Sequence, residues 1–364
     1  MYLKEIELEH FRNYDHQQVC FHDKVNIITG NNAQGKTNLL ESLYIMSLGK
    51  SFRTSRDTEM IAFGEKFFRA KSKSSKDGEE LVIEIAVSGE GKSVRIDGVR
   101  ARRTADLLEH VYMVIFSPED MKIVKEDPEK RRKFMDRELC QLKPVYFGNL
   151  SRYKKLLMNR NVLLRKNEGN SELCCVYDEG LADYGARIIK ERRQFVEKLS
   201  RMSGELHKKI TDGRETLSVS YECGLDDSRD TASLKEEFQN QLRRNFRRDV
   251  MRGTTGVGPH RDDLKLMIDG VDIRHYGSQG QQRTAALSLK LAELYLIKEE
   301  TGEDAILLLD DVLSELDIQR QTFLLSRLHD VQIFITAAEL SETLLSNLSD
   351  RYVFEVKNGT VTRV

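Results

Sequence analysis

The stretch Gly30-Asn31-Asn32-Ala33-Gln34-Gly35-Lys36-Thr37 decides the fold of this chain. It follows an apolar run at residues 25–28 and precedes apolar residues at helical spacing, so the local order is strand, loop, helix. The pattern G-x-x-x-x-G-K-[ST] in that order is typical of a phosphate-binding loop, in which two glycines let the backbone curl and its N–H groups surround a polyphosphate. An ordinary glycine-containing turn is the alternative interpretation.

Two side chains of this loop indicate what it binds. Lys36 is placed to reach the β- and γ-phosphates, and the hydroxyl of Thr37 is placed to bind Mg²⁺. The sequence therefore predicts a site for a nucleoside triphosphate with its magnesium ion.

Composition limits the classes of protein to which this chain can belong. Its 364 residues are 39% hydrophobic and 32% charged, and no apolar run approaches the roughly 20 residues that span a bilayer. Acids stand among the first residues, where a signal peptide is apolar, and the five cysteines lack C-x-x-C spacing. We therefore expect a cytoplasmic protein. Because the net charge is −1, any surface that binds nucleic acid is expected to be a local basic patch.

The order of elements predicts a head made from both ends of the chain and a helical insertion. Residues 3–29 and 50–103 carry strand signals, whereas residues 118–251 have few of them. We expect an α/β fold, with residues 1–112 and 252–364 in a head of mixed β-sheet and helices and residues 113–251 in an all-helical arm. A heptad spacing favours short antiparallel helices in that arm, and it places apolar residues at Leu181, Ile188, Phe195 and Met202.

A buried strand ends in two acids near the end of the chain. Residues 305–309 are apolar and lead into Asp310 and Asp311. An acid at the carboxyl end of a parallel strand is typical of a Walker B motif, so Asp310 is predicted to hold the Mg²⁺ together with Thr37. Asp311 is a candidate general base for an attacking water. Strand-terminal acids also cap helices, and that alternative stays open for both residues.

A second helix N-terminus carries the sequence Ser278-Gln279-Gly280-Gln281. A small polar residue and a glycine at such an end attract anions, because the free N–H groups and the helix dipole favour negative charge. The loop at residues 30–37 already provides one phosphate-binding end. We therefore expect this second end to serve a nucleotide that is bound by another copy of the chain.

A basic segment at residues 143–166 holds seven Lys or Arg and no acid. Several cations on one helix supply the salt-dependent attraction to a phosphate backbone. No motif suggests that base edges are read, so we predict that the protein recognises the phosphate backbone and the shape of DNA. The residues predicted to contact DNA are Arg152, Lys154, Lys155 and Arg160. A solvated helix face is the alternative for any single residue.

These motifs together resemble a known family. A Walker A loop, a helical insertion, a Ser-x-Gly-Gln signature, a Walker B strand and Ser314-Glu315-Leu316-Asp317 follow one another as in the ABC/SMC-type ATPase heads of chromosome-maintenance and repair proteins. Within that group the chain resembles the bacterial RecF family of DNA replication and repair proteins, at residues 11–14, 30–38, 116–120, 131–136, 258–263 and 276–284. These stretches span nearly the whole chain.

The resemblance implies a role for each matching residue. Residues 278–281 are expected on the γ-phosphate of a partner subunit, Asp317 on the dimer seam, and Asp310 and Asp311 at the metal and the attacking water. Arg12 resembles an arginine that approaches the nucleotide, and a surface arginine at a strand end is its alternative. The expected ATP-binding set is completed by Gly30, Asn31, Asn32, Ala33, Gln34, Gly35, Lys36, Thr37 and Asn38.

The resemblance also implies a function. ATP is expected to drive a homodimer that clamps DNA, with a preference for single-stranded, gapped or junction DNA, and slow, DNA-stimulated hydrolysis is expected to release it. Recombinase loading with RecR and RecO, and SOS induction, are implied as well. Two departures from the wider group favour slow turnover: Ser117-Pro118-Glu119 lacks a Q-loop glutamine, and Thr336 stands where many ABC ATPases have histidine.

Two other functions are alternatives. The ATP-binding subunit of an ABC transporter needs a surface for a membrane partner and usually has the Q-loop glutamine, which this chain lacks. An adaptor that uses ATP only as a dimerising ligand is expected to form a stable ATP-bound dimer without releasing phosphate.

Overall fold

The computed structural model describes residues 1–76, 78–166, 171–225, 230–326, 331–338 and 350–364. The chain divides into two compact units, Met1–Met121 with Lys290–Val364, and Lys122–Leu289. The second unit extends further along the chain than the arm expected at residues 113–251. Its assignment as an arm stays a prediction. Within the described residues, no helix combines the length and apolar character that crossing a membrane requires.

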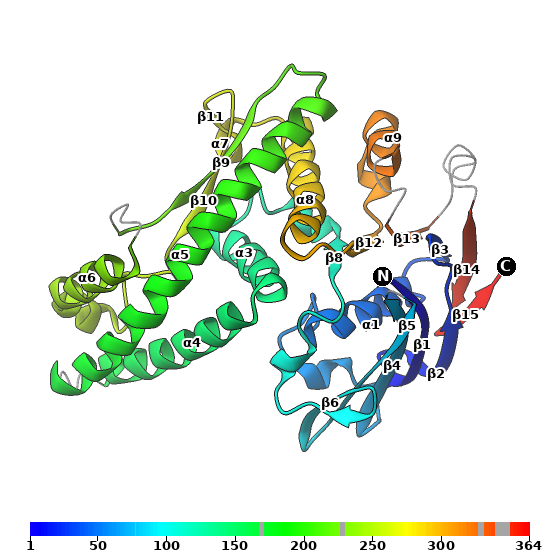
Figure 1. The fold of residues 1–364 in the computed structure, drawn as a ribbon, viewed down its shortest axis with the longest axis horizontal. Helices are drawn as coiled ribbons and strands as arrows, with labels where there is room; N and C mark the ends of the chain where they lie inside the picture. Colours follow the sequence, from blue (N-terminus) through cyan, green and yellow to red (C-terminus); the bar gives the residue numbers. More distant parts are fainter. Residues whose placement is uncertain (77, 167–170, 226–229, 327–330, 339–349) are drawn as a thin grey trace. The chain divides into compact units, whose positions relative to one another are not determined.

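The first unit contains a largely parallel sheet whose strands are brought together from distant parts of the chain (Figure 1). The strand order is β15-β14-β3-β13-β12-β8, and only β15 runs antiparallel to its neighbour. Strand β12 is buried throughout and β3 is buried except at Thr29, as expected of parallel strands covered on both faces. Their bounds are β3 (Val25–Thr29), β8 (Met113–Phe116), β12 (Ile306–Asp310), β13 (Ile333–Ala337), β14 (Arg351–Lys357) and β15 (Thr360–Arg363).

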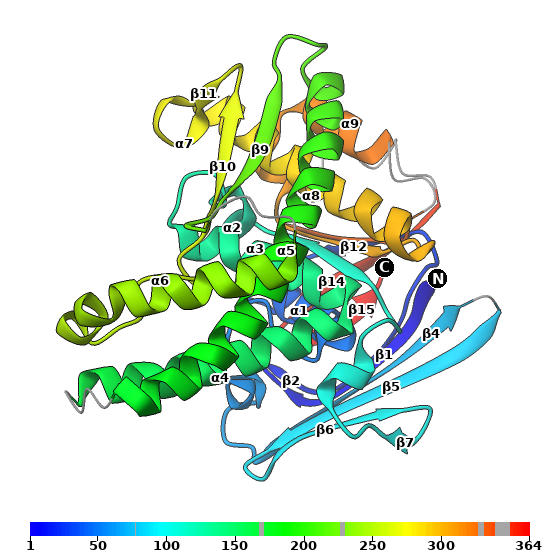
Figure 2. The same ribbon diagram turned by 60° about the vertical axis from the view of Figure 1, so that its left-hand side comes forward.

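A second, antiparallel sheet of this unit has the order β2-β1-β4-β5-β6-β7 and is seen clearly in Figure 2. Helix α1 (Lys36–Leu48) contacts strands of both sheets, and nearly all its residues are buried, the polar ones included. This position explains why α1 lacks a polar face. The antiparallel strands are β1 (Tyr2–Phe11), β2 (Tyr14–Cys20), β4 (Phe67–Lys76), β5 (Glu79–Ser88), β6 (Gly91–Ile96) and β7 (Val99–Arg100), and the remaining short helices are α2 (Pro118–Met121) and α9 (Ile318–Ser326).

The second unit is built around one long helix, α5 (Ser171–Ile210), which packs against α4 (Pro144–Arg165) and α6 (Thr231–Arg252). Leu181 and Ile188 of the heptad pattern are fully buried in this packing. The unit also holds a three-stranded sheet, so it is not all helical. Its other elements are α3 (Pro128–Leu142), β9 (Leu217–Glu222), β10 (Asp263–Ile268), β11 (Val271–Asp272), α7 (Ile273–Tyr276) and the first part of α8 (Gln279–Thr301), which continues into the first unit.

The loop at residues 258–263 ties these helices together through buried polar contacts. Arg131 of α3 donates two hydrogen bonds to the carboxylate of Asp263, at 2.6 and 2.8 Å. Arg192 of α5 donates to the carbonyl oxygen of Pro259 at 2.6 Å. Both arginines are almost fully buried. Because a buried charge is tolerated only when it is paired, these contacts fix how the helices pack.

His260 of the same loop is held in its neutral form. Its Nε2 lies 3.0 Å from the carbonyl oxygen of Thr255, which can only accept, so Nε2 carries the proton. Its Nδ1, at 2.7 Å, then accepts from the hydroxyl of Tyr153 on α4. Burial lowers the pKa of His260 from its usual 6.5 to about 4.

The lowered pKa predicts a loss of stability in mild acid. The folded state binds the His260 proton more weakly than the unfolded chain, so stability is fully present above pH 6.5 and is lost as the pH falls toward about 4. The loss is on the order of 3 kcal/mol, at about 1.4 kcal/mol for each pKa unit. Calorimetry between pH 7.5 and 5 is expected to show a steeper fall in Tm for the wild type than for His260→Gln. Parallel curves would contradict this account.

Candidate nucleotide-binding site

The loop between β3 and α1 has the backbone geometry that its glycines predict. Gly30 has a φ of +138° and Gly35 a φ of +123°, values that other residues rarely adopt. A Cβ added at Gly30 would lie 2.3 Å from the carbonyl oxygen of Val356, so no side chain fits there. The loop therefore depends on glycine at both positions, which an ordinary turn would not require.

The N-terminus of α1 faces this loop. Among the described residues, no side chain caps the helix at Gly35, so N–H groups of its first turn stay available to an anion. The Lys36 ammonium group folds back over the loop and donates to the carbonyl oxygens of Gly30 and Asn31, at 2.6 and 3.1 Å. Cation and N–H groups thus converge on one short segment.

Three polar side chains meet at the carboxyl edge of the parallel sheet. Thr37 Oγ1 and Thr336 Oγ1 each lie 2.9 Å from Oδ1 of Asp310. Asp310 ends β12 and is 7% exposed, and its burial raises the pKa of the carboxyl group while the two hydroxyl donors oppose that shift. A carboxylate beside a hydroxyl offers the oxygen ligands that Mg²⁺ prefers.

Asp311 differs from Asp310 in its surroundings. Its φ is +54°, an uncommon conformation for a residue other than glycine, and strain of this kind clusters at functional sites. Its backbone N–H donates to Thr336 Oγ1 at 2.9 Å. Within the described part of the chain, no donor is hydrogen-bonded to its carboxylate. The helix-capping alternative applies instead to Asp317, which accepts from the N–H of Arg320 in α9 at 2.9 Å.

Arg12 is anchored beside the loop by Glu41 of α1. Its Nε and Nη2 lie 2.8 and 2.7 Å from the two carboxylate oxygens of Glu41, whose side chain is fully buried. Arg12 also has a φ of +57°. Arg12 is therefore paired and partly buried, unlike the free surface arginine of the alternative interpretation.

Two residues to which sequence reasoning gave no role hold the loop in place. The Asn13 side chain donates to the carbonyl oxygen of Gln34 and accepts from the amide of Asn38, both at 2.8 Å. The Tyr14 hydroxyl donates to the carbonyl oxygen of Gly35 at 2.9 Å. Both residues lie in the stretch at residues 11–14. Sequence reasoning gave them no role because it did not show that this stretch lies beside the loop.

The predicted signature lies in the other unit, at the start of α8. Ser278 Oγ accepts from the N–H of Gln281 at 3.2 Å, and the Gln281 side chain accepts from the N–H of Ser278 at 2.9 Å. This reciprocal pair is a capping box that fixes the helix end. Ser278 and Gln279 are exposed, and Gly280 is partly buried.

The four predicted DNA contacts do not share one environment. Arg152, Lys154 and Lys155 are exposed on α4. Arg160 is fully buried and forms ion pairs with Asp178 at 2.6 Å and Asp249 at 2.8 Å. A buried arginine with two carboxylate partners is not available to a phosphate backbone, so Arg160 contributes to packing within the unit.

Asn13 provides a test of how the loop is held. Asn13→Ala removes two hydrogen bonds, each worth about 1 kcal/mol, and is expected to speed amide hydrogen exchange at residues 31–36 by roughly thirtyfold. The control is His16→Ala, which changes an exposed residue of β2. Equal exchange in both variants would show that Asn13 does not hold the loop.

Comparison with known proteins agrees with this geometry. The chain matches the RecF/RecN/SMC N terminal domain family over residues 2–362. It is 44% identical over 365 aligned positions to the DNA replication and repair protein RecF of Clostridium novyi, covering 100% of both chains. It is also 44% identical to that of Alkaliphilus oremlandii, covering 99% of this chain and 100% of that protein.

Solved structures give the same result. A structure of the recombination mediator protein RecF-ATPrS in the RecFOR pathway superposes with a TM-score of 0.93 at 40% identity, covering 100% of this chain and 98% of that one. An SMC head bound to the C-winged helix domain of ScpA, at 16% identity and a TM-score of 0.57, shares the fold alone. The phosphate-binding loop, the Walker B strand and these full-length matches together show that this chain belongs to the RecF family of DNA replication and repair proteins.

Proposed function

We propose that this chain is an ATP-dependent DNA-binding protein of recombinational repair and replication. The observation that carries the proposal is the 2.9 Å contact between Thr37 Oγ1 and the buried carboxylate of Asp310, beside the start of α1, where no side chain of the described residues caps the helix at Gly35. Similar structures are named RecF-ATPrS and RecF-ATP, which supports ATP as the nucleotide.

The first step of the proposal is ATP binding by residues 30–38. Backbone N–H groups and Lys36 bind the phosphates, and Thr37 and Asp310 hold Mg²⁺. The bound ion supplies positive charge that stabilises the charge developing on the phosphates. The oxygen donors of Thr37 and Asp310 suit this ion, because hard cations prefer such ligands.

Two further residues serve hydrolysis in this proposal. Asp311 acts as general base, since its carboxylate follows the metal-binding position directly. Arg12 approaches the nucleotide when its pairing with Glu41 is exchanged for phosphate contacts. Thr336, which donates to Asp310, occupies the strand-end position where many ABC ATPases have a histidine. This difference is consistent with slow turnover.

Dimerisation is the step that couples ATP to DNA. Residues 278–281 at the start of α8 exchange their reciprocal hydrogen bonds for contacts with the γ-phosphate held by a second copy, and Asp317 lies on the seam. The ATP-bound dimer clamps single-stranded, gapped or junction DNA, and slow hydrolysis releases it. Because the similar structures belong to a RecFOR pathway, we extend the proposal to RecR and RecO as partners in recombinase loading, and to SOS induction.

The dimer predicts a measurable change in size. In sedimentation velocity, the wild type is expected to shift from monomer to dimer when ATP and Mg²⁺ are added. Lys36→Met removes the cation that binds the phosphates, and Ser278→Arg blocks the signature end, so both are expected to stay monomeric.

A matched control is Ser151→Arg, which adds the same charge to an exposed helix surface and is expected to dimerise normally. A wild type that binds ATP and stays monomeric would refute the shared site. A stable ATP-bound dimer that releases no phosphate would favour the adaptor function over an ATPase.

The exposed cations of α4 provide the test of DNA contact. Reversing two charges in Lys154→Glu/Lys155→Glu is expected to weaken binding to a gapped duplex and to lower the salt slope by up to about 2, at about 0.9 for each lost phosphate contact. The control is Lys133→Glu on α3, whose side chain is 69% exposed. Equal affinity and slope in the wild type and the double variant would exclude this face from the DNA site.

A further inference from the structure

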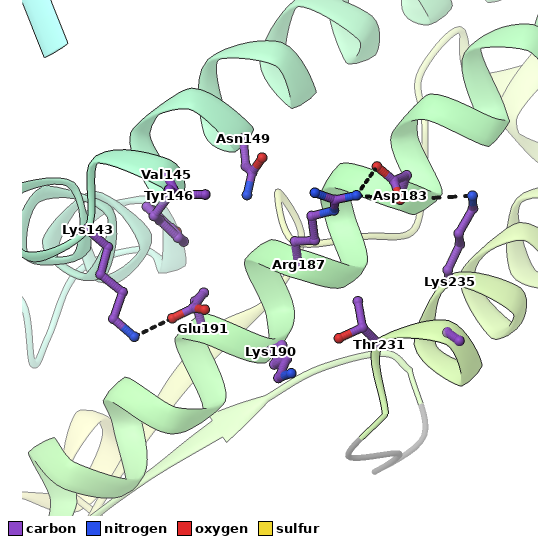
Figure 3. Close-up of a pocket in the computed structure, with 11 residues that line it drawn as sticks. Lys143, Val145, Tyr146, Asn149, Asp183, Arg187, Lys190, Glu191, Thr231 and Lys235 are labelled. Carbon is purple, nitrogen blue, oxygen red and sulfur yellow. Dashed lines mark hydrogen bonds and ion pairs between the residues drawn. The ribbon is translucent and has the colours of Figure 1, made fainter.

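A cavity of about 500 Å³ lies within the second unit (Figure 3), and none of the residues that line it belongs to the loop at residues 30–37. It is formed by the start of α4, the middle of α5 and the start of α6. Four cations and two carboxylates line it, and they are Lys143, Arg187, Lys190, Lys235, Asp183 and Glu191. The cavity is therefore polar, with an excess of positive charge.

The charges in this cavity are only partly paired. Lys143 lies 2.5 Å from Glu191, and Asp183 accepts ion pairs from Arg187 at 3.1 Å and Lys235 at 3.9 Å. Lys190 has no ion-pair partner within 4 Å among the described residues, and its charge acts at longer range on Asp230. It is the cation that can accept a carboxylate from outside without breaking an existing pair.

Asn149 provides a second, independent observation. Its residue is 8% exposed, and no described residue is hydrogen-bonded to its side-chain amide. Figure 3 shows this amide directed from α4 into the cavity. Because the amide has no protein partner in the described part of the chain, both its N–H and its C=O groups are available to a ligand in the cavity. An amide has one acceptor and one donor side, which match the N–H and C=O of a peptide group.

Part of the cavity wall is apolar. Val145 is 74% exposed at the start of α4, although valine is usually buried, and the buried ring of Tyr146 lies beside it. A free phosphate has no apolar part that could cover Val145. The combination of an apolar wall, an amide and one unpaired cation fits a peptide better than a nucleotide or a DNA backbone.

We propose that this cavity binds a short acidic segment of a partner protein. A peptide group of the segment pairs with Asn149, one of its carboxylates pairs with Lys190, and an apolar side chain covers Val145. This interaction surface is separate from the proposed ATP and DNA activities, because it uses none of their residues.

The test uses a fluorescein-labelled octapeptide in which aspartate alternates with leucine, measured by fluorescence anisotropy with the full chain. We expect binding of this peptide and none of a counterpart with lysine in place of each aspartate. Asn149→Leu and Lys190→Ala are each expected to weaken binding about five- to tenfold, the effect of losing one hydrogen bond or ion pair. If Asn149→Leu fails to fold, Lys190→Ala decides the outcome.

The control Lys155→Ala removes an exposed lysine of α4 that does not line the cavity, and it is expected to bind the peptide normally. ATP-driven dimerisation and DNA binding are expected to be unchanged in both cavity variants, which separates this inference from the proposed function. Absence of peptide binding, or equal binding by all variants, would overturn it. Displacement of the peptide by inorganic phosphate or by a short single-stranded DNA would identify an anion site and overturn it as well.

Discussion

The contact on which this structure depends is the hydrogen bond between Thr37 and Asp310, two residues far apart in the chain. It exists because β3, β12 and β13 are parallel neighbours, and parallel strands end at one common edge of the sheet. Thr336 joins from the third strand, so one buried carboxylate is held by hydroxyl groups from two separate segments. The same edge carries the phosphate-binding loop, and the sheet therefore positions the proposed metal and phosphate sites together.

Buried charge plays a corresponding role in the second unit. Arg131, Arg160 and Arg192 are almost fully buried, and each is paired with carboxylates or carbonyl oxygens of other elements. Removing one member of such a pair leaves an uncompensated charge, which is costly in a low-dielectric interior. Polar contacts thus fix the arrangement of these helices more narrowly than apolar packing alone, and they leave a charged cavity between three of them.

Sequence reasoning succeeded where a local pattern has one structural meaning. The strand, loop and helix around residues 30–37, the buried strand that ends at Asp310 and the helix that begins at Gln279 lie where local patterns predicted them. The full-length match to RecF proteins confirms the family. Strand β9 was missed, although Leu217–Glu222 alternates apolar and polar residues, because helical segments surround it. The buried position of Arg160 had no local signal, since its partners Asp178 and Asp249 come from other helices.

The sequence by itself determined the fold class, the family and the strand–loop–helix order around residues 30–37, because these depend on motifs whose residues are close together in the chain. Only the tertiary structure decided which side chains support that loop and which basic residues are exposed. It also decided that Asn149 and Lys190 share one cavity. The physical reason is that burial and pairing depend on contacts between segments separated by many residues, and the sequence pattern of one helix does not specify what packs against it.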